Sequence, residues 1–475
     1  MKGPILFLGI GGSGMSSLAH MALDLKLSVL GYDKKSSETT RYLEERGATI
    51  QNNIEQIPLE GIEMVVYSSA INDKHKQVFD DIKNKKIPLK HRSEFMHLLV
   101  SNQKSISVAG SHGKTSTTTM VSQILTELGM DPTIMIGGDT SLLEKRGGKI
   151  GGGKFAVYES DESDGTFLGH KASIRLLTNI DNDHLDYYKT RERLEDAFFE
   201  YISFGTAGDA VLYANDPGIR DVLLHKTKDI QFSPEFRLYL CLESKDTKSE
   251  WYLSLELTLG NQLIPIRYHI KDDVLEFDFP GFTSLSLQLP YPGIHYLTNG
   301  LVALVGAFVA GVSPEVSAGI LSRYIGVKRR QEILGIWNGV TVMDDYGHHP
   351  TEIAMVIRSL ENKLKSNGRL VVLFQPHRYT RTQLLLKELA ESLSLTDNLL
   401  ILPIYSAGEP PIPGITHESF LPFINTKNAE FLKGDMDLDL ISIKSKLQRG
   451  DMFLCLGAGN VRDWGLQLLE DKSKL

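Results

Sequence analysis

A glycine-rich stretch that ends in Gly-Lys-Thr has the chemistry of a nucleotide triphosphate site. Residues 110–115 follow an apolar run and precede a run of hydroxyl side chains. Backbone N–H groups of such a loop surround phosphate oxygens, the lysine reaches the β and γ phosphates, and the threonine hydroxyl binds Mg²⁺. The strict Walker pattern fails because position 108 is valine, but the place between a strand and a helix favours function over chance. The predicted site comprises Gly110, Ser111, His112, Gly113, Lys114, Thr115 and Ser116.

Acidic side chains and a histidine follow the next two predicted strands, 155–158 and 174–178. Glu159 comes directly after the first strand, and His184 ends the stretch after the second. Parallel strands bring their carboxyl ends to one edge of a sheet, and Mg²⁺ prefers carboxylates, phosphate oxygens and water. We therefore predict Thr115 and Glu159 as metal ligands, whereas His184 either binds a second metal, orients the γ-phosphate or has no such role. A solvated acidic loop is expected for Asp161, Glu162 and Asp164.

A first glycine turn lies at 9–14 and fits GxGxxG, with Asp33 about 20 residues further on. Glycines let backbone N–H groups approach a diphosphate at a helix N-terminus. Three interpretations remain open: a nicotinamide dinucleotide site, a site for another diphosphate, and a tight turn without a ligand. We favour the second, because the pattern reports a diphosphate rather than a nicotinamide. Ser68 and Ser69 end another strand of the same sheet, where they either donate to these phosphates or cap the next helix.

Two polar stretches in the last third of the chain each follow a predicted strand. Residues 344–352 contain two histidines and a proline that suits the first turn of a helix. Residues 375–382 contain Arg378 and Arg381, whose guanidinium groups are suited to bidentate binding of a carboxylate. Alternatively, either arginine forms a surface ion pair.

The elements that position these side chains alternate between strand and helix, which predicts parallel sheets in three α/β domains. Helices are expected at 15–25, 300–311, 351–364 and 383–393, a loop at 137–154, and antiparallel strands or an insertion at 220–290. The strands are expected at 5–8, 28–32, 64–67, 105–108, 155–158, 174–178, 340–343, 370–374, 399–403 and 452–456.

Composition narrows the class of protein. A chain of 475 residues exceeds one ordinary core, and about three domains are expected. The net charge of -8 argues against nucleic-acid binding. The two cysteines form no framework, which favours a reducing, cytoplasmic location. The longest apolar run, 300–312, is too short to span a membrane, so we expect neither a membrane nor a nucleic acid as partner.

The chain resembles the Mur ligase family along nearly its whole length, from Gly9 to Gly459. Two of the stretches, DDYGHHPTE and FQPHRYTRT, are typical of the alanine-adding member. Tyr32 and Tyr296 depart from the family pattern, where serine and asparagine are common, and Ser111 stands in place of a threonine. The matching stretches are GIGGSGMSSLAH, SSAI, AGSHGKTSTTT, ESDESDGTFL, TNIDNDHLDYY, PGIHYLTN, GVKRRQE, DDYGHHPTE, FQPHRYTRT, PIYSAGEPP and GAGN.

The resemblance implies a fold and an activity. It implies a Rossmann-like UDP-sugar-binding domain at 1–100, a P-loop ATPase-type domain that binds ATP at 101–325, and a Rossmann-like domain at 326–475 that binds the amino acid. The implied activity is ATP-dependent ligation of L-alanine to the carboxylate of UDP-N-acetylmuramate through an acyl phosphate, giving ADP and phosphate. ATP and Mg²⁺, or Mn²⁺ in its place, would be required, and the protein would be a monomer or a homodimer.

The resemblance also implies roles for individual residues. The first turn would hold the diphosphate of the UDP-sugar, with Gly11, Gly12, Ser13, Gly14, Met15, Asp33, Ser68 and Ser69. His295 and Asn299 would contact the adenine end of ATP, Asp345 the ribose, and Arg330 the nucleotide near a hinge. Catalytic roles would fall to Lys114, Glu159, His184 and His348, with metal bound by Thr115, Glu159 and His184. The substrates would meet Tyr346, His348, His377, Arg378 and Arg381.

Alternatives to this activity remain. A related ligase would attach a whole peptide rather than alanine. A nicotinamide oxidoreductase would use the first turn but would leave the Gly-Lys-Thr loop unexplained. A nucleotide sensor without catalysis would keep both folds. Either His184 or His348 could deprotonate the amine, and the sequence does not choose between them.

Overall fold

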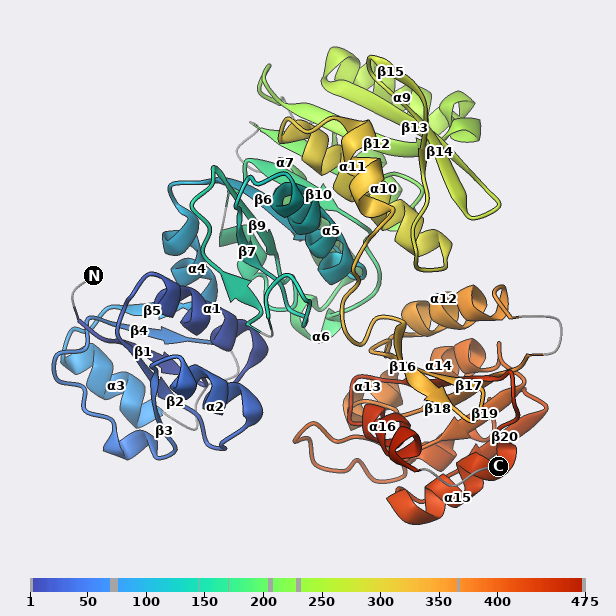
Figure 1. Cartoon of the computed structure of the whole chain (residues 1–475). Coiled ribbons are helices and arrows are strands. Elements are labelled where there is room, and N and C mark those ends of the chain that lie inside the picture. Colours follow the sequence, from blue (N-terminus) through green and yellow to red (C-terminus); the bar gives the residue numbers. More distant parts are fainter. Residues whose placement is uncertain are drawn as a thin grey trace. The chain divides into compact units, whose positions relative to one another are not determined.

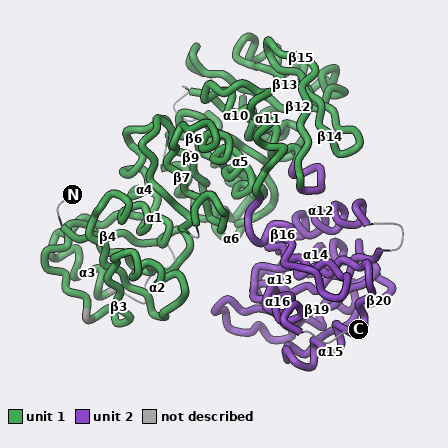
Figure 2. Tube along the Cα trace, in the orientation of Figure 1, with its two compact units in different colours: residues 1–290, 297–325 green, residues 291–296, 326–475 purple. Residues whose placement is uncertain are grey.

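Three sheets of largely buried strands organise the chain, as the computed structural model shows (Figure 1). The structure describes residues 3–68, 76–144, 146–169, 171–203, 208–227, 232–364 and 368–471. Two compact units are present (Figure 2): one comprises 1–290 with 297–325, and the other comprises 291–296 with 326–475. The expected α/β class with parallel sheets is confirmed.

The N-terminal sheet has the strand order β3-β2-β1-β4-β5, and all its strands are parallel. The central strand β1 (Ile5–Leu8) is fully buried because helices cover both of its faces. Phe7 points to the core that includes residues of α1 and α4, and Leu6 and Leu8 to the core on the α3 side. The other elements are β2 (Val29–Tyr32), β3 (Thr49–Gln51), β4 (Met64–Tyr67), β5 (Leu89–His91), α1 (Ser13–Asp24), α2 (Glu38–Glu45), α3 (Lys76–Asn84) and α4 (Arg92–Val100).

The strand order reverses beside β1. The chain passes from β1 to β2 on one side and later enters β4 on the other side. The carboxyl ends of β1 and β4 therefore flank the point where open α/β sheets bind ligands. The first glycine turn follows β1, and Ser68 follows β4 at this edge.

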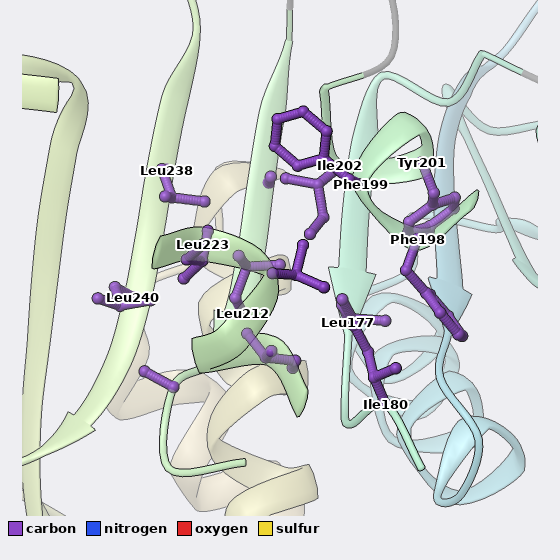
Figure 3. Close-up of a cluster of buried hydrophobic side chains, with 14 of the residues drawn as sticks. Leu177, Ile180, Phe198, Phe199, Tyr201, Ile202, Leu212, Leu223, Leu238 and Leu240 are labelled. Atoms are coloured by element: carbon purple, nitrogen blue, oxygen red, sulfur yellow. The ribbon is translucent and has the colours of Figure 1, made fainter. Parts of the chain in front are cut away.

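The central sheet has the order β15-β14-β13-β12-β11-β10-β6-β9-β7-β8. Leucines of β10, β11 and β12 pack against residues of α7 and α8 in one buried cluster (Figure 3). The strands are β6 (Lys104–Ala109), β7 (Thr133–Met135), β8 (Gly148–Lys149), β9 (Phe155–Glu159), β10 (Ile174–Leu177), β11 (Asp209–Tyr213), β12 (Arg237–Glu243), β13 (Leu263–Lys271), β14 (Val274–Phe279) and β15 (Phe282–Leu287). The helices are α5 (Lys114–Glu127), α6 (Leu185–Tyr188), α7 (Arg191–Ser203), α8 (Pro217–Lys226), α9 (Glu250–Leu259), α10 (Ile294–Val309) and α11 (Pro314–Leu321).

Residues 220–290 match the expected antiparallel strands only in part, at β13, β14 and β15. Strands β12 and β13 continue the parallel sheet from β11, and α8 and α9 belong to the same stretch. Only β14 and β15 pair in antiparallel fashion with their neighbours. The alternating pattern misled because one face of β13 and β14 is exposed, whereas β12 alternates only in part.

The C-terminal sheet has the order β16-β17-β21-β18-β19-β20, and only β16 is antiparallel to its neighbour. Pro350 occupies the first turn of α12, as expected. The helix expected at 383–393 is wrong as one element, because it is broken at Leu385 into α13 and α14. The elements are β16 (Glu332–Trp337), β17 (Val340–Asp345), β18 (Leu370–Phe374), β19 (Asn398–Ile401), β20 (Asn428–Phe431), β21 (Met452–Leu456), α12 (Pro350–Glu361), α13 (Tyr379–Leu384), α14 (Leu386–Leu393), α15 (Met436–Lys446) and α16 (Arg462–Glu470).

Both cysteines are free and buried, Cys241 in β12 and Cys455 in β21. Burial raises the pKa of both thiols well above the ordinary range. Among the described residues, no helix is both long and apolar enough to cross a membrane.

Candidate active site

The second glycine turn connects β6 to α5 and depends on two glycines. Gly110 has φ +133° and Gly113 has φ +82°, conformations that residues with a side chain rarely adopt. A Cβ on Gly110 would lie 2.2 Å from Thr178 Oγ1, and one on Gly113 would lie 2.8 Å from the Asn299 amide. The turn is therefore closed tightly by its neighbours.

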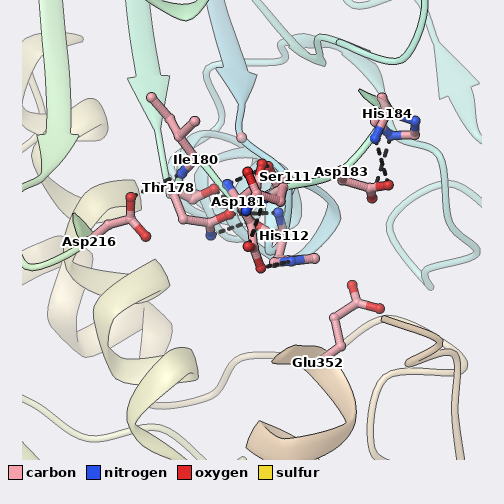
Figure 4. A network of polar contacts seen from close by, with 12 residues as sticks. Ser111, His112, Thr178, Ile180, Asp181, Asp183, His184, Asp216 and Glu352 are labelled. Carbon is pink, nitrogen blue, oxygen red and sulfur yellow. Dashed lines mark hydrogen bonds and ion pairs between the residues drawn. The ribbon is translucent and has the colours of Figure 1, made fainter. Parts of the chain in front are cut away.

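Side chains that follow the adjacent strand β10 hold this turn in place (Figure 4). Thr178 Oγ1 donates to the His112 carbonyl at 2.6 Å, and Asn179 exchanges hydrogen bonds with the main chain of His112 at 2.8 and 2.9 Å. The Asp181 N–H donates to Ser111 Oγ at 2.9 Å, and Asp181 Oδ2 lies 3.0 Å from His112 Nε2. The predicted site did not include these three residues, although Thr178 ends a predicted strand and Asn179 and Asp181 follow it at the same edge.

Lys114 begins α5 and lies within hydrogen-bonding distance of three acceptors. Its Nζ donates to the carbonyls of Gly110 and Ser111 at 2.5 and 3.2 Å and to Glu162 Oε1 at 2.8 Å. Glu162 has only 1% of its side chain exposed. The expected solvated acidic loop is therefore wrong for Glu162, because it turns inward to pair with the lysine.

The two flanking acids of that loop are also engaged. Asp161 Oδ2 accepts from Arg92 Nη2 at 2.6 Å, and its Oδ1 accepts the Ser163 N–H at 3.0 Å. Asp164 Oδ1 accepts from the Thr166 hydroxyl at 2.5 Å. The Asp161 side chain nevertheless remains 44% exposed, so the expected solvation is wrong for Glu162 but not for Asp161.

Electrostatics match a buried ion pair between Lys114 and Glu162. Burial alone lowers the pKa of Lys114, but the Glu162 carboxylate outweighs burial, and the pKa is raised. Burial raises the pKa of Glu162, and Lys114 opposes that shift only in part. Glu162 Oε2 is buried and lacks a hydrogen-bond partner among the described residues. A cation is the natural partner for this oxygen.

The three predicted metal ligands lie on separate elements of the first unit. Glu159 ends β9, which pairs with β6, and its Oε1 accepts the Gly137 N–H at 2.9 Å. His184 precedes α6 with φ +57°, and its Nε2 lies 3.7 Å from Glu162 Oε1. Thr115 is the second residue of α5. Carboxylate, hydroxyl and imidazole groups are ligand types that divalent cations bind. Among the described acidic and histidine residues, Glu159, Glu162 and His184 do not form a group close enough together to share one ion.

The first glycine turn is held mainly by the backbone. The N–H groups of Gly9 and Ile10 donate to the Tyr32 carbonyl at 2.8 and 3.0 Å, and the Gly11 N–H donates to Asp33 Oδ2 at 2.9 Å. Gly12 is the N-cap of α1, so no side chain caps this helix. Such a terminus suits an anion.

Other residues predicted for this turn lie in different surroundings. Ser13 and Gly14 form the first turn of α1, whereas Met15 is 2% exposed and packs in the core. Ser68 is partly buried after β4, which pairs with β1. Ser69 lies outside the described residues.

In the second unit, Asp345 ends β17 and is buried. Its carboxylate accepts the Gly347 N–H at 2.7 Å and the Gln331 N–H at 2.8 Å. Burial raises the pKa of Asp345 to about 6, against the opposing charge of Arg330. Arg330 also lies over the Tyr346 ring, 5.4 Å from its centroid.

The remaining residues that were predicted to meet the substrates cluster after β17 and β18. The His348 ring lies 5.4 Å from that of Tyr346 and 5.9 Å from that of His377. His377 Nδ1 lies 3.3 Å from Arg381 Nη1, and the Arg378 N–H donates to the Tyr405 carbonyl at 2.9 Å. Burial lowers the pKa of both His348 and His377 to about 4, so both imidazoles are neutral at pH 7.

His295 and Asn299 lie on one helix, α10. The boundary between the two compact units nevertheless falls between these two residues. Residues 291–296 group with the second unit and 297–325 with the first. Burial lowers the pKa of His295 to about 4. Tyr296, which departs from the family pattern, donates from its hydroxyl to the Arg330 carbonyl at 3.1 Å and stacks on Tyr291.

Family models match three successive parts of the chain. The model described as "Mur ligase family, catalytic domain" covers residues 4–104, "Mur ligase middle domain" covers 108–307, and "Mur ligase, glutamate ligase domain" covers 329–459. The first matched segment contains the first glycine turn, and the second contains the second glycine turn. The third contains the polar stretches 344–352 and 375–382.

Curated relatives match over nearly the full length. UDP-N-acetylmuramate--L-alanine ligase of Dictyoglomus turgidum is 39% identical, with 98% of this chain and 96% of that protein covered. The protein of the same description from Endomicrobium trichonymphae is 36% identical, with 98% of each covered.

Solved structures share the fold. UDP-N-acetylmuramate-alanine ligase from Thermotoga maritima superposes with a TM-score of 0.75 at 24% identity, with 98% of each chain covered. A murein peptide ligase from Psychrobacter arcticus gives a TM-score of 0.69 at 22% identity, also with 98% of each chain covered. Three family models in order, relatives of 36–39% identity and a shared three-sheet fold lead to one assignment. The chain belongs to the Mur ligase family.

Proposed function

We propose that the protein ligates L-alanine to the carboxylate of UDP-N-acetylmuramate, with ATP converted to ADP and phosphate. The observation that carries this proposal is the partly buried Lys114, which binds the closed glycine turn and Glu162, in a chain 39% identical to a ligase of that description. The matching order of motifs supports the same activity.

The domains divide this work in the proposal. Residues 1–100 bind the UDP-sugar, 101–325 bind ATP, and 326–475 bind the amino acid. The first turn holds the diphosphate, the second turn holds the triphosphate, and Asp345 with Arg330 contacts the nucleotide. A cytoplasmic location agrees with two unpaired, buried thiols.

Activation of the carboxylate requires transfer of the γ-phosphoryl group, since an oxide is a poor leaving group. Backbone N–H groups of the second turn bind the phosphates, and Lys114 leaves Glu162 to neutralise charge on the transferred group. Mg²⁺ held by Thr115, Glu159 and His184, with Glu162 next to it, would supply further charge neutralisation. Little covalent chemistry is asked of the protein, and positioning dominates.

The amine of alanine then attacks the acyl phosphate, and phosphate departs from the tetrahedral intermediate. Arg378 and Arg381 suit the carboxylate of the amino acid, because guanidinium binds it bidentately. A neutral His348 accepts a hydrogen bond from the amine and orients it. Its pKa of about 4 makes it a weak base, so orientation is the role that we propose for it.

Phosphate release tests the proposal directly. We expect turnover when UDP-N-acetylmuramate, ATP, Mg²⁺ and L-alanine are all present, and loss of turnover when the metal is chelated. Each other amino acid and a tripeptide, offered in turn, separate alanine addition from peptide addition. Absence of phosphate release with alanine, or preference for the tripeptide, would refute the proposed substrate.

A further inference from the structure

Arg92 links the first glycine turn to the acidic loop at 161–164, one residue of which pairs with Lys114. This residue begins α4, and its Nη1 lies 2.9 Å from the position that a Cβ on Gly14 would occupy. Its Nη2 donates to Asp161 Oδ2 at 2.6 Å and lies 3.8 Å from Asp164 Oδ2. The guanidinium therefore touches the first turn of α1 on one side and the acidic loop on the other.

The first turn needs such a cation. Residues 9–14 contain no basic side chain, and α1 has no basic residue in its first turn. A helix terminus attracts an anion only modestly, whereas a guanidinium adds charge-assisted hydrogen bonds. Arg92 Nη1 makes no hydrogen bond with the described residues, and its direction toward Gly14 places it beside the proposed diphosphate site.

We propose that Arg92 binds an anionic group of the UDP-sugar and that Asp161 occupies Arg92 when the sugar nucleotide is absent. This inference rests on the proposed function. The carboxylate of Asp161 pairs with the guanidinium at the same distance that a substrate oxygen would adopt. Asp161 holds Nη2 whereas Nη1 faces Gly14, so a substrate oxygen either displaces the carboxylate to bind both nitrogens or binds Nη1 beside a carboxylate that repels it. In both cases the charge of Asp161 opposes binding of the substrate.

The contact between Arg92 and Asp161 is linked to the ATP site by the neighbouring residue in the sequence. Asp161 adjoins Glu162, which holds Lys114. Release of Arg92 would remove a tether from the loop whose next residue restrains the phosphate-binding lysine.

The proposal predicts that substitutions of Arg92 and of Asp161 change the affinity for the sugar nucleotide in opposite directions. Affinity for UDP-N-acetylmuramate would be measured by calorimetry with a nonhydrolysable ATP analogue and Mg²⁺ present. We expect Arg92→Gln to weaken binding about tenfold to a hundredfold, because a charge-assisted contact is lost. We expect Asp161→Asn to tighten it about threefold, because the internal competitor is removed. The double variant should bind like Arg92→Gln alone.

A purely structural ion pair would behave differently, since both single variants would then weaken binding alike. That result, or an unchanged affinity in Arg92→Gln, would overturn the proposal. Arg146→Gln is the matched control, because Arg146 also joins the central part of the chain to α1, through Asp24 at 3.4 Å. Its affinity should stay within about twofold of the wild type, as expected for a weak ion pair.

Two further arms make the result specific. UDP alone retains the diphosphate but lacks the carboxylate of the muramate. If Arg92→Gln weakens and Asp161→Asn tightens the binding of UDP, Arg92 contacts the diphosphate. If the two variants have these opposite effects only with the full substrate, Arg92 contacts the carboxylate. Thermal unfolding of each variant identifies misfolding, and Arg92→Lys then replaces a variant that does not fold. If the wild type itself neither binds UDP-N-acetylmuramate nor turns over, the proposed function fails instead.

Discussion

The second glycine turn is fixed by side chains of the neighbouring strand end, whereas the first is fixed by main-chain carbonyls and one carboxylate. Thr178, Asn179 and Asp181 all bond to the second turn, and Lys114 supplies its cation. Among the described residues outside α1, Asp33 supplies the side-chain hydrogen bond to the first turn, and residues 9–14 contain no basic side chain. Two similar glycine patterns are therefore held differently: one contains its own lysine, and for the other we propose that Arg92 supplies the positive charge.

Lys114→Ala should produce the largest difference between the turns. Turnover should fall about a thousandfold or more, because charge on the transferred phosphoryl group loses its main partner. Binding of UDP-N-acetylmuramate should be largely intact, as calorimetry can show. Lys104→Ala changes an exposed lysine at the opposite end of β6 and should leave turnover unchanged. Equal loss of turnover and of sugar-nucleotide binding in Lys114→Ala would show that the two turns are not separate sites.

Alanine substitutions in the turns test the difference in backbone strain. Gly110→Ala should destabilise the protein by at least about 2 kcal/mol, because φ +133° is strained and the new Cβ would overlap Thr178. Turnover should fall about a hundredfold as the loop shifts. Gly12→Ala meets only the Gly9 carbonyl at 3.4 Å and has an ordinary φ of -67°, so urea unfolding should show little change. A similar cost for both variants would contradict the unequal closure of the turns.

Asp33→Ala should loosen the first turn without affecting the second. Loss of the acceptor for the Gly11 N–H should weaken binding of UDP-N-acetylmuramate about tenfold, as expected for a charge-assisted hydrogen bond. The Michaelis constant for ATP should be unchanged. Asp33→Asn, which keeps an acceptor oxygen, should recover part of the affinity. If only the Michaelis constant for ATP changed, Asp33 would act on the ATP site and not on the first glycine turn.

Acid should affect the helix behind the first turn. His20 in α1 is 1% exposed, and its Nδ1 lies 2.9 Å from Arg46 Nη1. Burial, followed by Arg46, lowers the pKa of His20 from 6.5 to about 4. The unfolded chain therefore binds more protons between pH 6.5 and 4, and the free energy of unfolding falls as pH falls through this window.

His20→Gln should reduce that acid sensitivity. The loss of unfolding free energy between pH 7 and 5 should shrink by about 1–2 kcal/mol, because one titrating group is removed. Turnover at pH 7.5 should be unchanged. Urea unfolding at the two pH values measures the effect, and an unchanged pH dependence would show that His20 contributes nothing to it.

Local sequence patterns predicted those elements that are buried on all sides or that begin at a glycine turn. Strand β1 and the turn-to-helix steps into α1 and α5 are specified by short apolar runs and adjacent glycines, so the sequence placed them closely. The pairing direction of strands β13 and β14 was harder to predict. One face of each strand is exposed, which gives the alternation of polar and apolar residues that is also typical of antiparallel sheets. The break at Leu385 leaves no proline or glycine signal in the sequence.

The candidate site was predictable only where function resides in one short motif. Glu159 ends β9, which pairs with β6, and Lys114 begins α5 after the turn that follows β6, as expected. The inward turn of Glu162 depends on tertiary contacts, and Arg92 lies 69 residues from Asp161 in the sequence. Ion pairs of this kind arise from strand order, which residue spacing alone does not reveal.

The burial of Cys241 and Cys455 makes the protein convenient for site-directed labelling. A buried thiol with a raised pKa reacts slowly with maleimide reagents, because the thiolate is the nucleophile. One cysteine introduced at an exposed position in each unit would therefore accept fluorescent dyes without prior removal of the native thiols. Energy transfer between such dyes would report directly whether nucleotides alter the distance between the units.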